Sequence, residues 1–197
     1  LAHIATLTNK PVKFVVNTHW HGDHSGGNEN MAKAGALIVA HDNVRKRMSV
    51  DQLNQVNNRR TPASPAAALP VVTFADEVTF HVNGDDVTAS HTKSAHTDGD
   101  VLLKFAKADV IHMGDTFFTM GSYPYVDLAS GGDVTGIVTA ADKGLAMCGA
   151  QTIIIPGHGP STDCAGLREW RNMAQTVIER VRAEMRKNLT LDQLKAA

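Results

Sequence analysis

Residues 18–27 read THWHGDHSGG, a stretch in which the pattern His19-x-His21-x-Asp23-His24 gathers three imidazoles and a carboxylate. On an extended segment, His19 and His21 point to the same side, because side chains alternate there with period two. Asp23 and His24 are adjacent, so their side chains diverge and could serve a second ion. Crowding such groups together without a metal would be costly. Imidazole and carboxylate suit zinc, and also iron or manganese.

Three more residues of the same kinds lie beside predicted strand ends, in loops that contain glycine. They are His96 in SAHTDGD, Asp115 in HMGDTFF and His158 in PGHGP. A strand end is a stiff platform that can hold a side chain in place. Together with the first motif they make seven candidate ligands, which suit two metals with an open position between them. The remaining histidines are interpreted as surface or core residues: His3, His41, His81, His91 and His112.

Hydrophobic periodicity predicts strands that alternate with helices. Strands are expected at Val12–Asn17, Ala36–Ala40, Val101–Phe105, Asp109–Met113 and Thr152–Ile155, with a hairpin of Val78–Val82 and Val87–Thr92 around Asn83-Gly84. Helices are expected at Asn28–Ala34, Asp42–Met48, Asp133–Met147 and Leu167–Met185. The proline-rich stretch Thr61–Pro70 is expected to be a surface connection. This pattern indicates an α/β (α+β) sandwich with mixed sheets, and we expect residues 1–197 to form one domain. His81 and His91 are expected to face each other across the hairpin.

Composition is that of an ordinary globular chain and excludes several classes of function. Of 197 residues, 43% are hydrophobic and 20% are charged, and the formal net charge is −1. There is no basic excess, so nucleic acid is not expected as a partner. The longest apolar runs are strand-sized, so no membrane span is expected. Cys148 and Cys164 could form one disulfide or remain buried free thiols.

The ordered set of motifs resembles the metallo-β-lactamase-fold hydrolase superfamily. The resemblance is carried by HxHxDH at residues 19–24, followed in order by His96, Asp115 and His158, and it runs from about Val12 to Gly159. It implies an αββα sandwich that holds two zinc ions, with iron or manganese as alternatives. The first ion would be bound by His19, His21 and His96, the second by Asp23, His24 and His158, and Asp115 would bridge both together with a hydroxide.

The resemblance implies a hydrolase in which the bridging hydroxide attacks the carbonyl of an ester, thioester, lactone or amide, including a lactam. Asp23 is the expected catalytic proton relay as well as a ligand. Asp115 stands where the best-known zinc β-lactamases carry cysteine or serine, and a bridging aspartate is the pattern of glyoxalase II-like thioesterases and lactonases. The alternatives are a low-activity β-lactamase-like enzyme, an iron-dependent oxidoreductase on the same ligands, and a metal-stabilised binding domain without catalysis.

The expected substrate is a small molecule, and the expected wall of its site is Thr116–Gly132. The aromatic candidates are Phe117, Phe118, Tyr123 and Tyr125, joined by Trp20 from the first motif, and core packing is the alternative for each. That stretch has no lysine or arginine, so it gives no support for an anionic substrate. Thr18, Asp98 and Asp100 are candidates for holding the second nitrogen of the ligand imidazoles.

Only 18 residues precede His19, whereas members of the superfamily carry several strands before this motif. We therefore expect that the N-terminal strands of the sandwich are missing from this chain and that one sheet has an uncovered edge, at which the chain could self-associate. The first residues lack the features of a signal peptide. Because relatives with similar HTDGD and PGHGP loops are often exported, a periplasmic or secreted location is favoured by resemblance only.

Overall fold

The structure is a computed structural model that describes residues 1–54, 58–121, 123–187 and 189–196. Its strands are β1 (Phe14–Val16), β2 (Leu37–His41), β3 (Gln52–Asn54), β4 (Arg59–Thr61), β5 (Val72–Phe74), β6 (Glu77–Val82), β7 (Asp85–His91), β8 (Val101–Phe105), β9 (Val110–His112), β10 (Ile153–Ile155) and β11 (Thr162–Asp163). Its α-helices are α1 (Ala2–Leu7), α2 (Gly22–Ser25), α3 (Asn28–Lys33), α4 (Asp42–Met48), α5 (Val134–Ala146), α6 (Cys164–Met185) and α7 (Leu191–Ala196).

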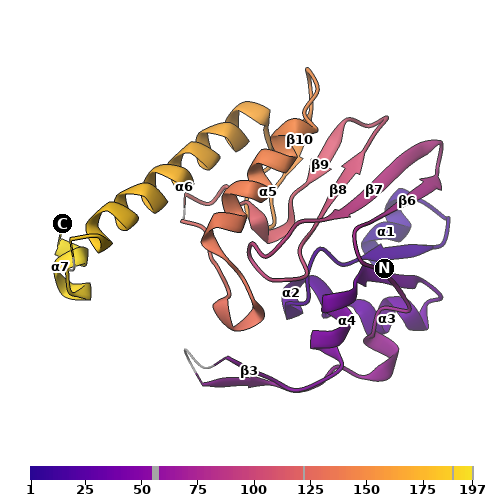
Figure 1. The fold of residues 1–197 in the computed structure, drawn as a ribbon. Helices are drawn as coiled ribbons and strands as arrows, with labels where there is room; N and C mark the ends of the chain where they lie inside the picture. The colour runs from indigo at the N-terminus through magenta and orange to yellow at the C-terminus, as the bar shows by residue number, and fades with distance from the viewer. Residues whose placement is uncertain (55–57, 122, 188, 197) are drawn as a thin grey trace.

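Two sheets form the centre of the molecule. The first has three parallel strands in the order β1-β2-β5, and the second has six strands in the order β11-β10-β9-β8-β7-β6. In the second sheet β9 and β10 are parallel, whereas the other neighbours are antiparallel. Figure 1 shows α5 and α6 along one side of the six-stranded sheet and α2 to α4 on the opposite side of the molecule.

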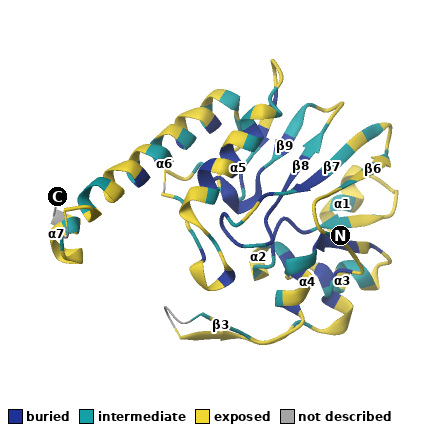
Figure 2. Ribbon diagram, viewed as in Figure 1, coloured by how far each residue is buried: buried dark blue, intermediate teal, exposed yellow. Residues whose placement is uncertain are grey.

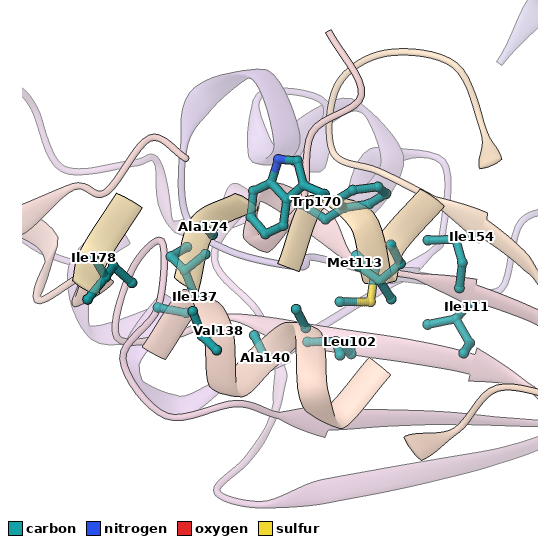
Figure 3. Close-up of a cluster of buried hydrophobic side chains, with 14 residues drawn as sticks. Leu102, Ile111, Met113, Ile137, Val138, Ala140, Ile154, Trp170, Ala174 and Ile178 are labelled. Atoms are coloured by element: carbon teal, nitrogen blue, oxygen red, sulfur yellow. The ribbon is translucent and has the colours of Figure 1, made fainter. Parts of the chain in front are cut away.

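Burial on both faces of β8 shows why the layers stack as α-β-β-α. Leu102 points into a cluster with residues of α5 and α6, whereas Val101 and Leu103 point into a second cluster between the two sheets. The first cluster is drawn in Figure 3, and the dark strands of Figure 2 run through both. A third cluster covers the outer face of the first sheet, where Ala40 of β2 packs against Val44 of α4. The predicted sandwich is therefore confirmed.

Strand direction brings the candidate loops to one edge. Because β7 and β9 are each antiparallel to β8, and β10 is parallel to β9, the strands β7, β9 and β10 all end at the same edge of the six-stranded sheet. The loops that carry His96, Asp115 and His158 follow these three strands. The first motif follows β1 in the neighbouring sheet. The topology thus gathers segments that are up to 139 positions apart in the chain, from His19 to His158.

Most predicted elements are confirmed, with ends that differ by at most three residues from the prediction. Helix α5 begins after Asp133, whose carboxylate accepts hydrogen bonds from the backbone N–H groups of Thr135 and Gly136. The β3–β4 pair, β5, β11 and the short helices α1, α2 and α7 were not predicted. The segments of β3 and β4 are short and polar, so their hydrophobic pattern gives no strand signal. Residues 55–57 of that hairpin region lie outside the described residues.

The expected pairing of His81 with His91 is wrong. In the register of the hairpin, His81 lies opposite Asp86, and its Nδ1 is 2.6 Å from Asp86 Oδ1. His91 instead reaches the other sheet, where its ring stacks on His41 with the centroids 3.7 Å apart. His81 lies beside the Asn83-Gly84 turn, whereas His91 lies at the end of β7 farthest from that turn, so the two cannot be opposite each other in the hairpin register.

The two cysteines form a disulfide, which decides the alternative that the sequence left open. Cys148 follows α5 and Cys164 begins α6, so the bond ties the two helices that cover the six-stranded sheet. At the far side of the molecule, β1 pairs with β2 alone among the described strands, and Phe14 and Leu37 are exposed beside that edge. None of the described helices is both long and apolar enough to cross a membrane.

Candidate metal centre

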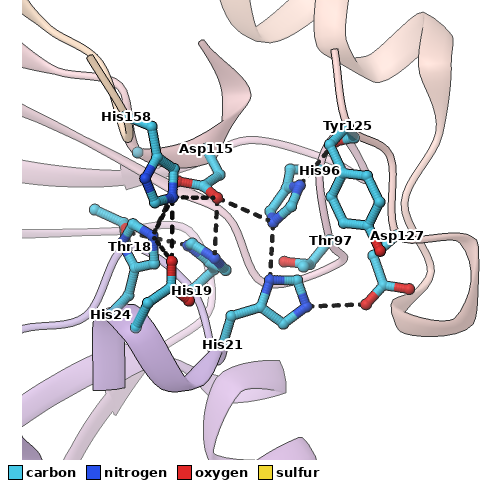
Figure 4. A network of polar contacts seen from close by, with 12 residues as sticks. Thr18, His19, His21, His24, His96, Thr97, Asp115, Tyr125, Asp127 and His158 are labelled. Carbon is cyan, nitrogen blue, oxygen red and sulfur yellow. Dashed lines mark hydrogen bonds and ion pairs between the residues drawn. The ribbon is translucent and has the colours of Figure 1, made fainter. Parts of the chain in front are cut away.

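Local structure fixes the first motif at the end of β1. Asn17 and Asn28 exchange two side-chain hydrogen bonds, of 3.0 Å and 2.8 Å, and Asn17 also donates to the carbonyl of His24. Ser25 Oγ donates to the carbonyl oxygens of Trp20 and His21. These contacts hold the turn into α2, so that His19, His21 and His24 point to one region (Figure 4), and Asp23 shares a group of candidate ligands with His24.

The seven predicted ligands are all brought together, in two groups. His19, His21 and His96 form the first, and Asp23, His24, Asp115 and His158 form the second; within each group the candidate ligand atoms lie within 4.8 Å of one another. In the first group His96 Nε2 is 2.9 Å from His21 Nδ1. In the second, His158 Nε2 lies 3.1 Å from Asp23 Oδ2 and 3.4 Å from His24 Nε2.

Asp115 belongs to the second group but also faces the first. Its Oδ2 is 3.8 Å from His19 Nε2 and 3.5 Å from His96 Nε2, and it is 3.4 Å from His158 Nε2 on the other side. Its Oδ1 is 3.0 Å from His24 Nε2. One carboxylate therefore faces imidazoles of both groups, which is the arrangement that a bridging ligand requires.

Two glycines permit this close approach. A Cβ on Gly157 would lie 2.0 Å from Asp115 Oδ1, so any side chain there would push the His158 loop away from Asp115. Gly114 has a φ of +55°, and a Cβ on it would lie 2.8 Å from Thr18 Cβ. Glycine at position 157 thus lets the loop after β10 approach Asp115 and the backbone of Gly114, and glycine at position 114 lets the loop after β9 approach Thr18.

Burial disfavours the charged forms of His19 and His96. Burial lowers the pKa of His19 well below its usual value, and the surrounding imidazoles lower it further. Burial also lowers the pKa of His96. Burial acts against the charged form of His24 as well, but the carboxylates of Asp115 and Asp23 outweigh it, so the pKa of His24 is raised. A neutral imidazole is the form that binds a metal, so burial favours the ligand form of His19 and His96.

The donor atoms fit a metal better than they fit each other. His19 Nε2 and Asp115 Oδ1 are buried atoms that make no hydrogen bond of good geometry within the described part of the chain; Asp115 Oδ1 has only its ion-pair contact with His24 Nε2 at 3.0 Å, and His19 Nε2 lies 3.8 Å from Asp115 Oδ2. Leaving a buried polar atom unsatisfied costs about 1–3 kcal/mol. Two cations held among these side chains would satisfy both atoms, and imidazole with carboxylate is a donor set that suits zinc, iron or manganese.

Hydrogen bonds from a single loop orient two of the imidazoles. His21 Nε2 is 2.9 Å from Asp127 Oδ2, and His96 Nδ1 donates to the carbonyl of Tyr125 at 2.8 Å (Figure 4). Ser130 Oγ donates to Asp127 Oδ2 and accepts from Trp20 Nε1. Although burial acts to raise the pKa of Asp127, its hydrogen bonds with Ser130 and His21 hold that pKa below the usual value.

The role of Asp127 was missed by sequence reasoning. The run Asp-Leu-Ala-Ser-Gly-Gly has the composition of an Asx turn, and Asp127 does accept from the N–H groups of Ala129 and Ser130. That signal predicts the turn, but it does not identify His21, 106 positions away, as the partner of the carboxylate.

Of the three predicted partners for the imidazoles, only Thr18 has the expected contact, at 3.2 Å between its Oγ1 and His19 Nδ1. Asp98 instead pairs with the guanidinium of Arg47. Asp100 accepts from the backbone and the hydroxyl of Thr97, and burial raises its pKa to about 7. Asp100 therefore holds the backbone of the His96 loop, and Asp98 ties that loop to Arg47 of α4, so neither carboxylate is bonded to an imidazole.

A cavity of about 500 Å³ opens beside the two groups. Trp20 and Tyr125 line it together with His21 and Asp23, as expected for a substrate wall. Phe118 stacks on the ring of His158, with the centroids 5.6 Å apart. Phe117 lies in the core against Trp170, and Tyr123 lies on a different cavity.

The opposite side of this cavity comes from the β3–β4 hairpin, which was not predicted. It contributes Gln52, Asn54, Arg59 and Thr61. The stretch 116–132 has no lysine or arginine, but Arg59 brings a cationic residue to the cavity from the other side. The composition of that stretch therefore does not exclude an anionic substrate from the cavity.

Comparison with known proteins gives a family and a fold. The family model described as "Metallo-beta-lactamase superfamily" matches residues 2–158. A metallo-beta-lactamase from Pontibacter korlensis superposes with a TM-score of 0.72, at 23% identity, over 89% of this chain and 74% of that one. The DIM-1 metallo-beta-lactamase superposes with a TM-score of 0.62, at 22% identity, over 82% of this chain and 68% of that one. At these identities the two structures support the fold alone.

Two curated relatives bear the name hydroxyacylglutathione hydrolase. The protein of Erythrobacter litoralis is 29% identical over 111 residues, which are 56% of this chain and 36% of that protein. The protein of Nitrosococcus oceani is 29% identical over 147 residues, which are 73% of this chain and 47% of that protein. The matches thus span less than half the length of either relative.

Proposed function

This chain belongs to the metallo-beta-lactamase superfamily, and we propose that it is a two-metal hydrolase that cleaves an acyl bond of a small molecule. The observation that carries the proposal is the position of Asp115, whose carboxylate faces imidazoles of both groups. Membership of the superfamily gives the chain the fold of a metal-binding hydrolase. We propose that it binds two ions, that both are zinc and that the bond it cleaves is an acyl bond.

In this proposal His19, His21 and His96 hold one ion, Asp23, His24 and His158 hold the other, and Asp115 contacts both. Zinc is proposed for both sites, with iron or manganese as alternatives for the same donor set. When bound, two such ions lower the pKa of a water between them and polarise a carbonyl oxygen. The side chains supply the remaining functions, which are orientation, exclusion of water and movement of the proton.

Asp23 is proposed to move the proton. Its side chain is 56% exposed, whereas that of Asp115 is 6% exposed, so of the two carboxylates Asp23 is the one open to the cavity. Its Oδ2 lies within 3.2 Å of both His24 Nε2 and His158 Nε2. The carboxylate oxygen of Asp23 that does not hold the ion would take up the proton, and because the side chain is 56% exposed it could pass that proton to solvent.

Among acyl compounds, we propose thioesters first, followed by esters and lactones. Support comes from the name of both curated relatives, which describes hydrolysis of an acylated glutathione, and from an aspartate rather than cysteine or serine at position 115. The structural neighbours named metallo-beta-lactamases make lactam cleavage the second activity to measure. An iron-dependent oxidoreductase on the same ligands stays the alternative to hydrolysis.

The test is a panel of thioester, ester, lactone and β-lactam substrates, assayed with zinc, with iron and with a chelator. We expect zinc-dependent hydrolysis that the chelator removes. His21→Ala and Asp115→Ala should abolish it, whereas His81→Ala should not, because His81 is an exposed histidine paired with Asp86 outside the site. Full activity of His21→Ala on each substrate that the parent cleaves would disprove the site. Hydrolysis with iron alone would assign iron to the same site, whereas consumption of O2 with iron and no hydrolysis of any substrate would favour the oxidoreductase alternative.

We also propose that the protein works outside the reducing cytoplasm. The Cys148–Cys164 disulfide supports this location, since such bonds persist in oxidising compartments. The test is the thiol content of protein isolated from its native cells under conditions that trap free thiols. Two free thiols per chain would contradict the proposal.

A further inference from the structure

The β3–β4 hairpin carries an arginine into the cavity beside the metal centre. In Figure 1, β3 extends away from both central sheets, so the hairpin adds a wall that the sandwich itself does not supply. Arg59 of β4 lines this cavity of about 500 Å³ and is exposed, so a bound small molecule can reach its guanidinium. It is the one lysine or arginine among the described residues that line the cavity.

Strand register explains why Arg59 faces the cavity. It lies opposite Asn54, and Thr61 lies opposite Gln52. Residues directly opposite each other in an antiparallel pair share one face, and so do residues two positions apart in a strand. These four residues therefore lie on one face of the hairpin, and all four line the cavity.

Arg60, the next residue along the chain, provides an internal comparison. It lies opposite Leu53, on the other face of the hairpin. Leu53 also borders the cavity, but Arg60 is not among the described residues that line it. Both arginines are exposed and carry the same charge. A difference between variants at positions 59 and 60 would therefore report the position of the charge and not the net charge of the protein.

Contacts at its base hold the hairpin beside a loop that carries a ligand. Gln52 Nε2 donates to the carbonyl of Arg47 at 2.9 Å, and Arg47 Nη1 donates back to Gln52 Oε1 at 3.3 Å. Two further hydrogen bonds of 2.8 Å join the Arg47 guanidinium to the carboxylate of Asp98, two residues after His96. A wall tied down in this way presents Arg59 on a supported element next to the metal centre.

Charge in the cavity favours an anion. The two carboxylates that line it already have partners, because Asp127 holds His21 at 2.9 Å and Asp23 is a proposed metal ligand. Arg59 supplies a single positive charge, which matches a carboxylate better than a phosphate monoester that carries about 1.5 to 2 negative charges. The planar fork of the guanidinium also fits the two oxygens of a carboxylate.

We propose that Arg59 determines specificity by binding a carboxylate that the substrate carries apart from the acyl bond that is cleaved. The substrate class is then an acidic thioester, ester or lactone, in preference to a neutral one. This inference rests on the proposed function, since it names the substrate class of the same site. Arg59 contacts the substrate away from the reacting atoms, so it sets affinity and not the chemical step.

The test measures binding to the zinc-loaded protein by calorimetry, so that it does not depend on hydrolysis. Succinate, glutarate and adipate are each compared with their monoamides, which keep one carboxylate for the ions but lose the second charge. We expect Arg59→Gln to lower the ratio of acid affinity to monoamide affinity about 2- to 5-fold for the acid whose length fits, the range for an exposed ion pair. Comparison with the parent ratio cancels the statistical advantage of a symmetrical acid. Added salt should lower the parent ratio, because it screens exposed charges.

Arg60→Gln is the matched control and should keep the parent ratio, whereas Arg59→Lys keeps the charge and should retain part of the preference. Hydrolysis of a neutral thioester, S-phenyl thioacetate, is measured on the same preparations. A ratio that falls in Arg59→Gln, in a protein that cleaves no thioester, would support this inference and count against the proposed function. An unchanged ratio in Arg59→Gln for all three acids, or an equal fall in Arg60→Gln, would overturn the inference whether or not the thioester is cleaved.

Discussion

Replacement of Asp127 by asparagine should weaken metal binding at the first group without unfolding the protein. The carboxylate lies 2.9 Å from His21 Nε2, and its side chain is 7% exposed, so water does not readily take its place. A hydrogen bond to a charged group contributes about 1.5–3 kcal/mol. Since about 1.4 kcal/mol is a factor of ten, the affinity for the first ion should fall roughly 10- to 100-fold, in the range found for outer contacts of metal ligands.

Asparagine keeps the shape of the side chain and an acceptor for the N–H groups of Ala129 and Ser130, so the turn should survive. The assay is competition for zinc against a chelator of known affinity, with urea unfolding as a check on the fold. Ser130→Ala is the matched control, because it removes the hydroxyl that donates to Asp127 but leaves the carboxylate on His21. Its loss of zinc affinity should be several-fold smaller. If Asp127→Asn bound two equivalents of zinc as tightly as the parent, the orienting role of the loop would be refuted.

Three further predictions concern stability and assembly. Replacing Cys148 and Cys164 by alanine should lower the free energy of unfolding by about 3 kcal/mol, the effect of closing a loop of this length, and urea melts should show it without loss of bound zinc. Burial lowers the pKa of both His41 and His91, and the neighbouring His41 lowers the pKa of His91 further. Below the usual histidine pKa the unfolded chain therefore binds more protons than the folded chain. Stability should therefore fall as pH drops from about 7 toward the depressed pKa values, and His91→Gln should lose less between pH 7 and pH 5.5 than the parent; an equal loss would show that the stacked pair is not responsible. Self-association at the edge of β1 stays a prediction, and we expect sedimentation velocity to show a concentration-dependent dimer, whereas a monomer at each concentration would contradict it.

The sequence was most informative where chemistry and periodicity coincide. His19, His21 and Asp23 could be assigned to a metal site because crowding such polar groups together without a metal would be costly. The structure brings all seven candidate ligands together. Helix α5 was predicted within one residue at each end, since Asp133 is an N-cap and the apolar spacing is regular.

Other features could not be read from the sequence because they depend on distant partners. His91 contacts His41, 50 positions earlier in the chain, through the packing of two sheets. Asp127 reaches His21 through a turn whose position in space depends on β7 and α5. Likewise, nothing in the polar run around Arg59 indicates that it folds over the same cavity as Trp20.

The central claim is that the two groups of ligands hold two metal ions, and stoichiometry tests it most directly. Protein stripped of metal is dialysed to equilibrium against zinc and analysed for zinc per chain by elemental analysis. We predict two equivalents for the parent and a loss of zinc for Asp115→Ala, because Asp115 is shared by both groups. Binding of less than one equivalent by the folded parent, or two equivalents bound with unchanged affinity by Asp115→Ala, would contradict the account.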